Sequence, residues 1–181
     1  EKTSAMTQLG RYLHFTELLK ARGIEIPIKH CSNSAGIIDL PQANLNCVRA
    51  GITMYGMYPS EEVQKDKVPL KPALGLKSFV TYVKELGPGE EISYGGTYVT
   101  ERTMRIATVA VGYGDGYPRS LSNCGYVLIC GKRARILGRV CMDQLMVDVT
   151  DIMEADVDTP VTLIGKDGDE EITMEHLAEL C

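Results

Sequence analysis

The stretch that decides the fold carries SYGGTY (Ser93–Tyr98), VGYGDGYPR (Val111–Arg119) and GRVCMDQ (Gly138–Gln144). These three segments, rich in glycine and polar groups, lie between apolar runs of the kind that form β-strands. We therefore predict a mainly β structure from about residue 73 to the end. The predicted strands are Leu76–Leu86, Met104–Val111, Gly125–Cys130, Arg135–Leu137, Leu145–Val149 and Val161–Ile164, and a terminal helix is predicted at Thr173–Leu180.

The first third of the chain has a different pattern. A helix is predicted from Ser4, as its N-cap, to Arg22, because apolar residues recur at helical spacing and Gly23 follows. Apolar runs at Ile24–His30 and Val48–Tyr55 predict strands. The segment SNS (residues 32–34) predicts a short capped helix through residue 40. Helix, strand, helix, strand indicates parallel α/β units, here too few to close a barrel.

Between these parts, residues 59–72 hold many charged residues and three prolines, which indicates a linker. The predicted domains are therefore residues 1–58, a linker at 59–72, and residues 73–181. Because the chain begins with Glu1 rather than Met, we expect it to start inside a longer protein.

Composition limits the classes of function. Of 181 residues, 44% are hydrophobic and 24% are charged, as in ordinary globular proteins, and the net charge of −5 argues against nucleic-acid or anionic-membrane partners. No apolar run approaches the roughly 20 residues of a membrane span. Six cysteines without a CxxC motif indicate free thiols and a cytoplasmic protein. With only three histidines, none at zinc-ligand spacing to a cysteine, we expect no metal site.

Two adjacent segments, HCSNSAG and CVRAGITMYG, could form a phosphate site. Asn33 and Ser34 would begin a short helix, whose free N–H groups attract anions, and Gly51 would let the backbone approach a ligand. In (β/α)₈ barrels the loops after the last two strands often bind phosphate. On spacing alone, a simple helix cap and a packing glycine are the favoured explanation of these residues.

Taken together, these motifs resemble the alanine racemase family of pyridoxal-phosphate enzymes. The resemblance implies the last βα units of a (β/α)₈ barrel followed by a carboxy-terminal β-barrel-like domain. It implies that Asn33, Ser34, Gly51 and Ile52 hold the phosphate of pyridoxal 5'-phosphate, and that Arg49 faces the pyridine nitrogen. The lysine that carries the cofactor in this family matches no residue of this chain.

An arginine opposite the pyridine nitrogen has a chemical consequence. A guanidinium stays cationic and cannot accept a proton, so it disfavours a protonated pyridine ring and makes the cofactor a weaker electron sink. A weaker sink suits racemisation over transamination. Whether His30 supports Arg49 or is simply a satisfied histidine is left open by the sequence.

Racemisation needs an acid–base group on each face of the α-carbon. By resemblance one is the missing lysine and the other is Tyr94, supplied by the opposite subunit. An unperturbed tyrosine has a pKa of about 10, so it needs cationic neighbours to act near neutral pH. The resemblance also places Tyr113, Cys141, Met142 and Asp143 in the substrate site, with the Met142 N–H donating to the substrate carboxylate, and places Arg119 and Arg139 at the entrance. For both arginines a plain surface role is an equal alternative.

These expectations define a function for a longer protein. It would be a cytoplasmic, homodimeric racemase that interconverts L-alanine and D-alanine, a small amino-acid substrate, and supplies D-alanine for peptidoglycan. The chain alone would be inactive. A serine or broad-specificity racemase of the same fold, and a non-catalytic dimerisation domain, are the alternatives.

Overall fold

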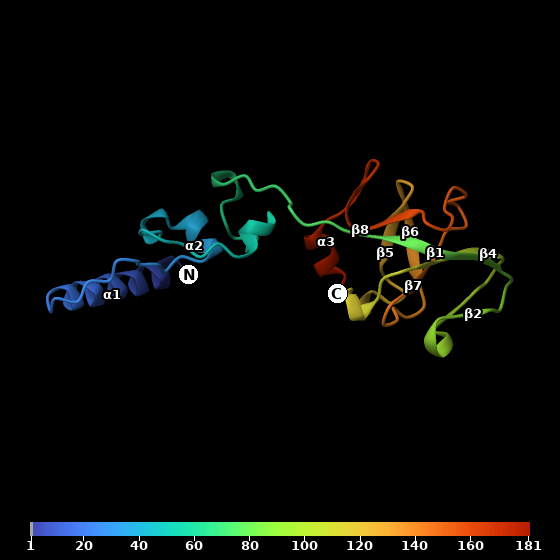
Figure 1. The fold of residues 1–181 in the computed structure, drawn as a ribbon, viewed down its shortest axis with the longest axis horizontal. Coiled ribbons are helices and arrows are strands. Elements are labelled where there is room, and N and C mark those ends of the chain that lie inside the picture. The colour runs from blue at the N-terminus through green and yellow to red at the C-terminus, as the bar shows by residue number, and fades with distance from the viewer. Residues whose placement is uncertain (1) are drawn as a thin grey trace. The chain divides into compact units, whose positions relative to one another are not determined.

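The computed structural model describes residues 2–181 and forms two compact units, which meet in the sequence between Leu74 and Gly75. Each unit has its own secondary structure (Figure 1). The first unit holds α1 and α2, and the second holds every strand together with α3. The domain bounds drawn from the sequence stay predictions.

The second unit is an antiparallel β-barrel (Figure 1). Six strands follow the order β1–β4–β7–β6–β5–β8, and pairing of β8 with β1 closes the ring. Closure leaves these strands without a free edge. β9 pairs with the last residues of β8, Gly165 to Asp167. The bounds are β1 Leu76–Leu86, β4 Met104–Val109, β5 Tyr126–Ile129, β6 Lys132–Leu137, β7 Leu145–Asp148, β8 Pro160–Asp167, β9 Glu170–Ile172 and α3 Met174–Glu179.

Closure depends on the long strand β1. Its first half pairs with β8 and its second half pairs with β4, and its register shifts between Val80 and Tyr82. Such a bulge bends a strand and increases its twist, which lets one strand serve two neighbours around a barrel. Val80 lies at this bend and is fully buried. The barrel interior is filled by buried aliphatic side chains of β4 to β8, among them Val109, Leu128, Ile136, Val147 and Leu163.

A small hairpin stands beside the barrel and carries the SYGGTY motif. Its strands are β2 (Glu91–Ile92) and β3 (Tyr98–Val99), joined by the 3₁₀ turn η4 (Tyr94–Gly96). Ile92 is buried in a second apolar cluster with Met104, Ile106 and Leu137. The apolar anchor at Ile92 therefore holds the hairpin, and with it the turn that carries Tyr94, against the barrel.

The first unit is built on α1 (Lys2–Lys20) and α2 (Ser34–Asp39). The predicted first helix is present, but Ser4 lies inside it and does not cap it. Its carboxy end agrees with the prediction. Gly23 has φ +78, and the backbone N–H of Ile24 donates to Leu19 O, so the glycine turns the chain out of the helix. α2 is capped as expected, because Asn33 Oδ1 accepts from the Gly36 N–H at 3.1 Å.

The two strands predicted in the first unit are wrong. Residues 24–30 have no regular structure, and residues 48–55 give an irregular segment followed by the 3₁₀ helix η2 (Ile52–Tyr55). The second segment makes one backbone hydrogen bond just beyond the first, from Arg49 N–H to Ser32 O at 3.0 Å. A parallel strand needs a ladder of such bonds to its neighbours. The described residues provide no further strand in this unit, so the apolar runs stay irregular.

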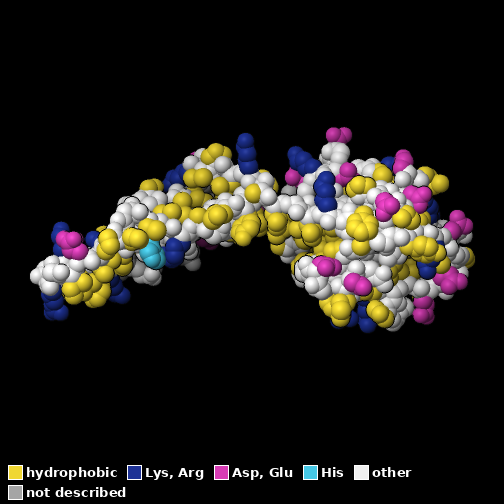
Figure 2. All heavy atoms as spheres, in the orientation of Figure 1, with side chains coloured by type: hydrophobic (Ala, Val, Ile, Leu, Met, Phe, Trp, Pro, Cys, Tyr) yellow, Lys and Arg dark blue, Asp and Glu magenta, His cyan; other side chains and the backbone are white. Residues whose placement is uncertain are grey.

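Residues 59–72, predicted as a linker, fall within the first unit and contact its other residues. Val63 is buried, and the Gln64 N–H donates to Asp39 Oδ1 at 3.1 Å. The Tyr58 hydroxyl donates to Val68 O at 3.0 Å. Apolar side chains also remain at the surface of this unit (Figure 2), including Phe15, Leu18, Ile28, Met54 and Tyr55.

Candidate functional site

In the first unit, hydrogen bonds to the hydroxyl of Ser34 connect the two predicted phosphate-binding segments. Its oxygen accepts the backbone N–H of Gly51 at 3.1 Å and that of Thr53 at 3.5 Å, and lies 3.2 Å from Thr53 Oγ1. Ser34 is buried, whereas Asn33, Gly51 and Ile52 are exposed around it. The structure therefore brings the four predicted residues together, with two hydroxyls and several backbone N–H groups that suit a phosphate.

Thr53 was not predicted to take part. It belongs to the same GITMYG run as Gly51, and that proximity was its only signal in the sequence. Its side chain and its N–H both contact the Ser34 hydroxyl. Thr53 therefore fixes the loop that carries Gly51 and Ile52 against the start of α2.

Arg49 and His30 form a pair. Arg49 Nη1 lies 2.7 Å from His30 Nδ1. A guanidinium can only donate, so His30 Nδ1 accepts and the ring carries its proton on Nε2. The histidine thus holds the guanidinium in place, which decides the alternative left open by the sequence in favour of support for Arg49.

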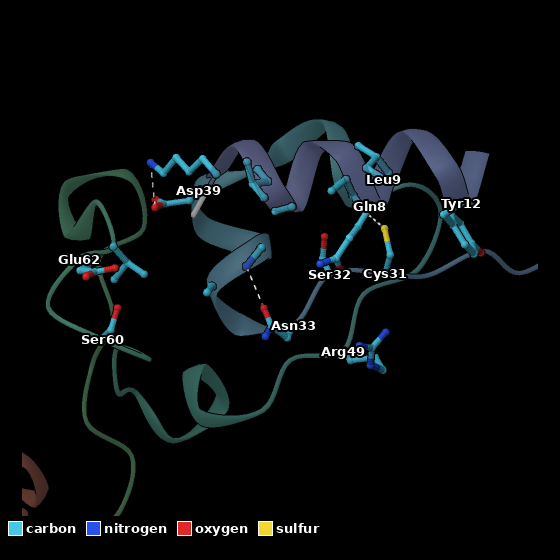
Figure 3. A pocket seen from close by; sticks show the side chains of 17 residues that line it. Gln8, Leu9, Tyr12, Cys31, Ser32, Asn33, Asp39, Arg49, Ser60 and Glu62 are labelled. Carbon is cyan, nitrogen blue, oxygen red and sulfur yellow. Dashed lines mark hydrogen bonds and ion pairs between the residues drawn. The ribbon is translucent and has the colours of Figure 1, made fainter. Parts of the chain in front are cut away.

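A pocket of about 540 Å³ lies between α1 and the segment that leads into α2 (Figure 3). Gln8, Leu9 and Tyr12 of α1 face Cys31, Ser32 and Asn33 across it, and Arg49 lies at one side. The pocket shares only Asn33 and Arg49 with the predicted cofactor residues. The pocket and the cluster around Ser34 are thus neighbouring but separate features of this unit.

In the second unit, Tyr94 begins the turn η4 and 72% of its surface is exposed. Its hydroxyl has no hydrogen-bond partner among residues 2–181. The guanidinium of Arg139 lies against the next residue, since a Cβ built on Gly95 would stand 3.4 Å from Arg139 Nη1. Tyr94 is therefore an exposed phenol that is free to contact a ligand, on a turn whose next residue lies against a guanidinium.

The predicted substrate residues lie on two segments that are bonded to each other. The Tyr113 N–H donates to Cys141 O at 2.9 Å, and the Gly114 N–H donates to Met142 O at 2.7 Å. Gly112 permits this approach, because a Cβ there would overlap Cys141 O and the Met142 carbonyl carbon. Tyr113 opens the 3₁₀ turn η5 (Tyr113–Asp115), so the chain makes a tight bend here.

Met142 and Asp143 are exposed at the end of this segment, whereas Cys141 is buried. Within the described residues the Met142 N–H donates no hydrogen bond, although its carbonyl is engaged. An exposed, unengaged N–H can serve a carboxylate oxygen of a ligand. All six cysteines are free, but Cys141 alone of the six is buried, so the apolar runs around the others do not enclose their thiols.

Arg119 and Arg139 line one shallow surface depression with Ser120 and Ser122. The Arg119 guanidinium lies 5.9 Å from the centre of the Tyr113 ring, a cation–π contact. Both predicted entrance residues thus lie beside predicted substrate residues.

Among residues 2–181, no group of three or more His, Cys, Asp or Glu side chains is placed to hold a metal ion. No helix in the described part of the chain is long and apolar enough to cross a membrane.

Comparison with known proteins gives the family. The family model described as "Alanine racemase, C-terminal domain" matches residues 73–181, and the one described as "Alanine racemase, N-terminal domain" matches residues 1–59. The alanine racemase of Methanococcus maripaludis is 49% identical over 97% of this chain, and that of Clostridium perfringens strain SM101 is 47% identical over 99%. The chain spans about half the length, 47%, of each relative.

Solved structures agree. An alanine racemase of Clostridium difficile 630 in complex with cycloserine matches with a TM-score of 0.90 and 42% identity, over 99% of this chain and 47% of that one. The alanine racemase of Bacillus anthracis with bound L-Ala-P matches with a TM-score of 0.89 and 40% identity, over 99% and 46%. The predicted fold class, the end of a (β/α)₈ barrel followed by a β-barrel-like domain, is thereby confirmed. The chain belongs to the alanine racemase family.

Proposed function

We propose that the chain works within a longer protein as part of a pyridoxal-phosphate-dependent alanine racemase. The observation that carries the proposal is Tyr94, an exposed phenol without a hydrogen-bond partner in the described chain, on a turn anchored to the barrel. A group that must take and give a proton at a ligand needs such freedom and such support. Family membership supports the reaction, since the matching relatives are named alanine racemases.

The first unit would hold the cofactor. Bound pyridoxal phosphate supplies the electron sink that stabilises negative charge at the α-carbon of an amino acid. Asn33, Ser34 and the N–H groups of Gly51 and Ile52 would bind its phosphate, with Thr53 keeping these groups together. Arg49, held by His30, would keep a positive charge beside the pyridine nitrogen.

The second unit would transfer the α-proton and bind the substrate. Tyr94 would take or give the α-proton on one face of the α-carbon, and a lysine outside this chain would do so on the other. The unengaged Met142 N–H would donate to the substrate carboxylate, with Tyr113, Cys141 and Asp143 around it. Arg119 and Arg139 would attract the carboxylate of an incoming amino acid.

The proposed racemase would act as a cytoplasmic homodimer and supply D-alanine for peptidoglycan. The exposure of Tyr94, Tyr113 and Met142 supports the dimer. If Tyr94 acts in the site of the other subunit, its side chain must be exposed on its own protomer. The related structures with cycloserine and L-Ala-P support a small amino-acid-like ligand.

Turnover by the full-length protein tests the proposal. Loaded with pyridoxal phosphate, it should interconvert L-alanine and D-alanine, with kcat/KM for alanine above that for serine. An equal or higher kcat/KM for serine would show that the protein is a serine or broad-specificity racemase instead of an alanine racemase. Absence of turnover for both amino acids would contradict the proposal.

A non-catalytic dimerisation domain is the second candidate, because the chain spans only about half the length of its relatives. Binding of pyridoxal phosphate distinguishes the two. The proposed racemase predicts the absorbance of covalently bound cofactor in the full-length protein and none in this chain, which has no matching lysine. A full-length dimer that binds no cofactor would favour the dimerisation domain.

A further inference from the structure

We infer that Ser93 is a positioning residue for the proposed racemisation. Its hydroxyl links the turn that carries Tyr94 to the segment that carries Met142. It thereby fixes the position of the Tyr94 phenol, the proton-transfer group, relative to the Met142 N–H, the carboxylate donor. The inference rests on the proposed function and extends it to a residue that contacts neither substrate nor cofactor.

The first observation is the backbone of Ser93. Its φ is +66 and its ψ is −179. This region is essentially reserved for glycine, because a Cβ crowds the neighbouring peptide groups. A serine stays there only when its surroundings hold it, so the side chain must supply something that glycine would not.

The second observation is what the Ser93 hydroxyl touches. Ser93 Oγ donates to Arg139 O at 2.6 Å and lies 3.4 Å from Cys141 Sγ. The Cys141 thiol also donates to Arg139 O at 3.6 Å, so the hydroxyl and the thiol meet at the same carbonyl. One hydroxyl therefore holds two points of the Arg139–Cys141 segment, 46 and 48 residues further along the chain.

The third observation is the close packing of Gly138 and Arg139 around the turn that contains Ser93. Gly138 has φ +74, and a Cβ built on it would stand 2.5 Å from Ile92 O and 2.7 Å from Ser93 Cβ. The backbone at Gly138 therefore presses directly on the residues before Tyr94. On the other side, the Arg139 guanidinium lies against Gly95. Ser93 is partly buried and is thus flanked on two sides by the segment to which it is bonded.

The consequence concerns both ends of the link. Tyr94 follows Ser93 directly, and Met142 follows Cys141 directly. A proton transfer needs its two heavy atoms within hydrogen-bond reach, and a misplacement of about 1 Å can lower a rate roughly 100-fold. A hydroxyl that couples the two segments therefore acts on the rate through Tyr94, without touching the reacting atoms itself.

The test uses Ser93→Gly in the full-length enzyme. Glycine adopts the φ of +66 without strain and lacks the hydroxyl, so the variant should fold at least as well as its parent. Its kcat/KM for alanine should fall roughly 10- to 100-fold, equally in both directions, because the two enantiomers have the same free energy. Ser93→Ala, which keeps the backbone strain, should show the same loss of activity with a lower Tm.

Asp158→Gly is the matched control. Asp158 also has φ +66, lies exposed in the same unit and bonds through its N–H to Val80 O, away from the site. This substitution also puts glycine at a position of positive φ and should leave kcat/KM unchanged.

Isotope effects separate positioning from a general structural fault. With α-deuterated L- and D-alanine, Ser93→Gly should raise the primary isotope effect for the enantiomer whose proton Tyr94 takes and should not raise it for the other. A loss of folded enzyme would leave both effects as in the parent. Unchanged kcat/KM, or reduced kcat/KM with both isotope effects unchanged, overturns the inference alone. A parent enzyme without alanine turnover overturns the proposed function and this inference with it.

Discussion

At the scale of residues, one glycine brings two segments of the candidate site together. Gly112 lets the backbone N–H groups of Tyr113 and Gly114 reach the carbonyls of Cys141 and Met142. The φ of Gly112 is −151, an extended backbone that any residue adopts. Space, and not backbone freedom, therefore requires glycine at this position.

Substitution of Gly112 by Ala should both destabilise the barrel and lower turnover. The new methyl group would overlap three backbone atoms, which cannot move as a flexible side chain can, so a loss of about 2 kcal/mol is expected. Thermal unfolding of this chain and kcat/KM of the full-length enzyme measure the two effects. Gly87→Ala is the control, because nothing lies within 4 Å of its added Cβ. Equal Tm values for the two variants would contradict the argument.

Residues differ in how far the sequence reveals them. The motifs marked Tyr94, Arg49 and Met142, whose roles in the site stay predictions. Ser93 stands in the same motif, but its link to Arg139 spans 46 residues and depends on a backbone angle. Neither a long-range contact nor a φ value can be read from a local pattern.

At the scale of elements, the predicted β-strands of the second unit are confirmed, because their apolar runs are buried inside a closed ring. β2, β3 and β9 were missed, since strands of two or three residues carry too little pattern. The runs at 24–30 and 48–55 have a strand-like composition without strand structure. A strand-like composition shows that a segment can form a strand. The strand forms only where a neighbouring strand is present to hydrogen-bond with it.

Asp39 connects three elements of the first unit. It accepts the Gln64 N–H and pairs with Lys2 Nζ at 3.1 Å. The backbone hydrogen bond from Gln64, followed by the charge of Lys2, lowers the pKa of Asp39 below its ordinary value. A lowered pKa contributes stability that is present above the unfolded-state pKa of about 3.9 and is lost as pH falls through the folded-state pKa.

Replacing Asp39 by Asn should therefore lower the Tm of this unit at pH 6 and have little effect near pH 2. Asn can still accept from Gln64 but cannot pair with Lys2. Thermal unfolding of this chain across that pH range checks the prediction, with Asp66→Asn as the control on an exposed carboxylate in the same unit. A Tm difference that is constant with pH would show that the charge of Asp39 contributes nothing.

At the scale of the whole molecule, the two units differ in how completely they bury their apolar side chains. The barrel encloses its core, whereas the first unit leaves Phe15, Ile28 and Met54 at the surface. Backbone hydrogen bonds with little apolar cover open more readily. In this chain alone, amide hydrogen exchange should therefore be fast in residues 2–74 and slow in β4 to β8. Equal protection of both units would contradict this account of the burial.

The central claim concerns the phenol of Tyr94, and the full-length enzyme with Tyr94→Phe tests it most directly. The ring stays and only the hydroxyl is lost, so the fold and cofactor absorbance should be unchanged, while alanine racemisation should fall by roughly 100- to 10,000-fold. Tyr82→Phe, which removes a hydroxyl from an exposed ring on β1, serves as the control and should keep its activity. A Tyr94→Phe enzyme that racemises alanine at the parental rate would contradict the account.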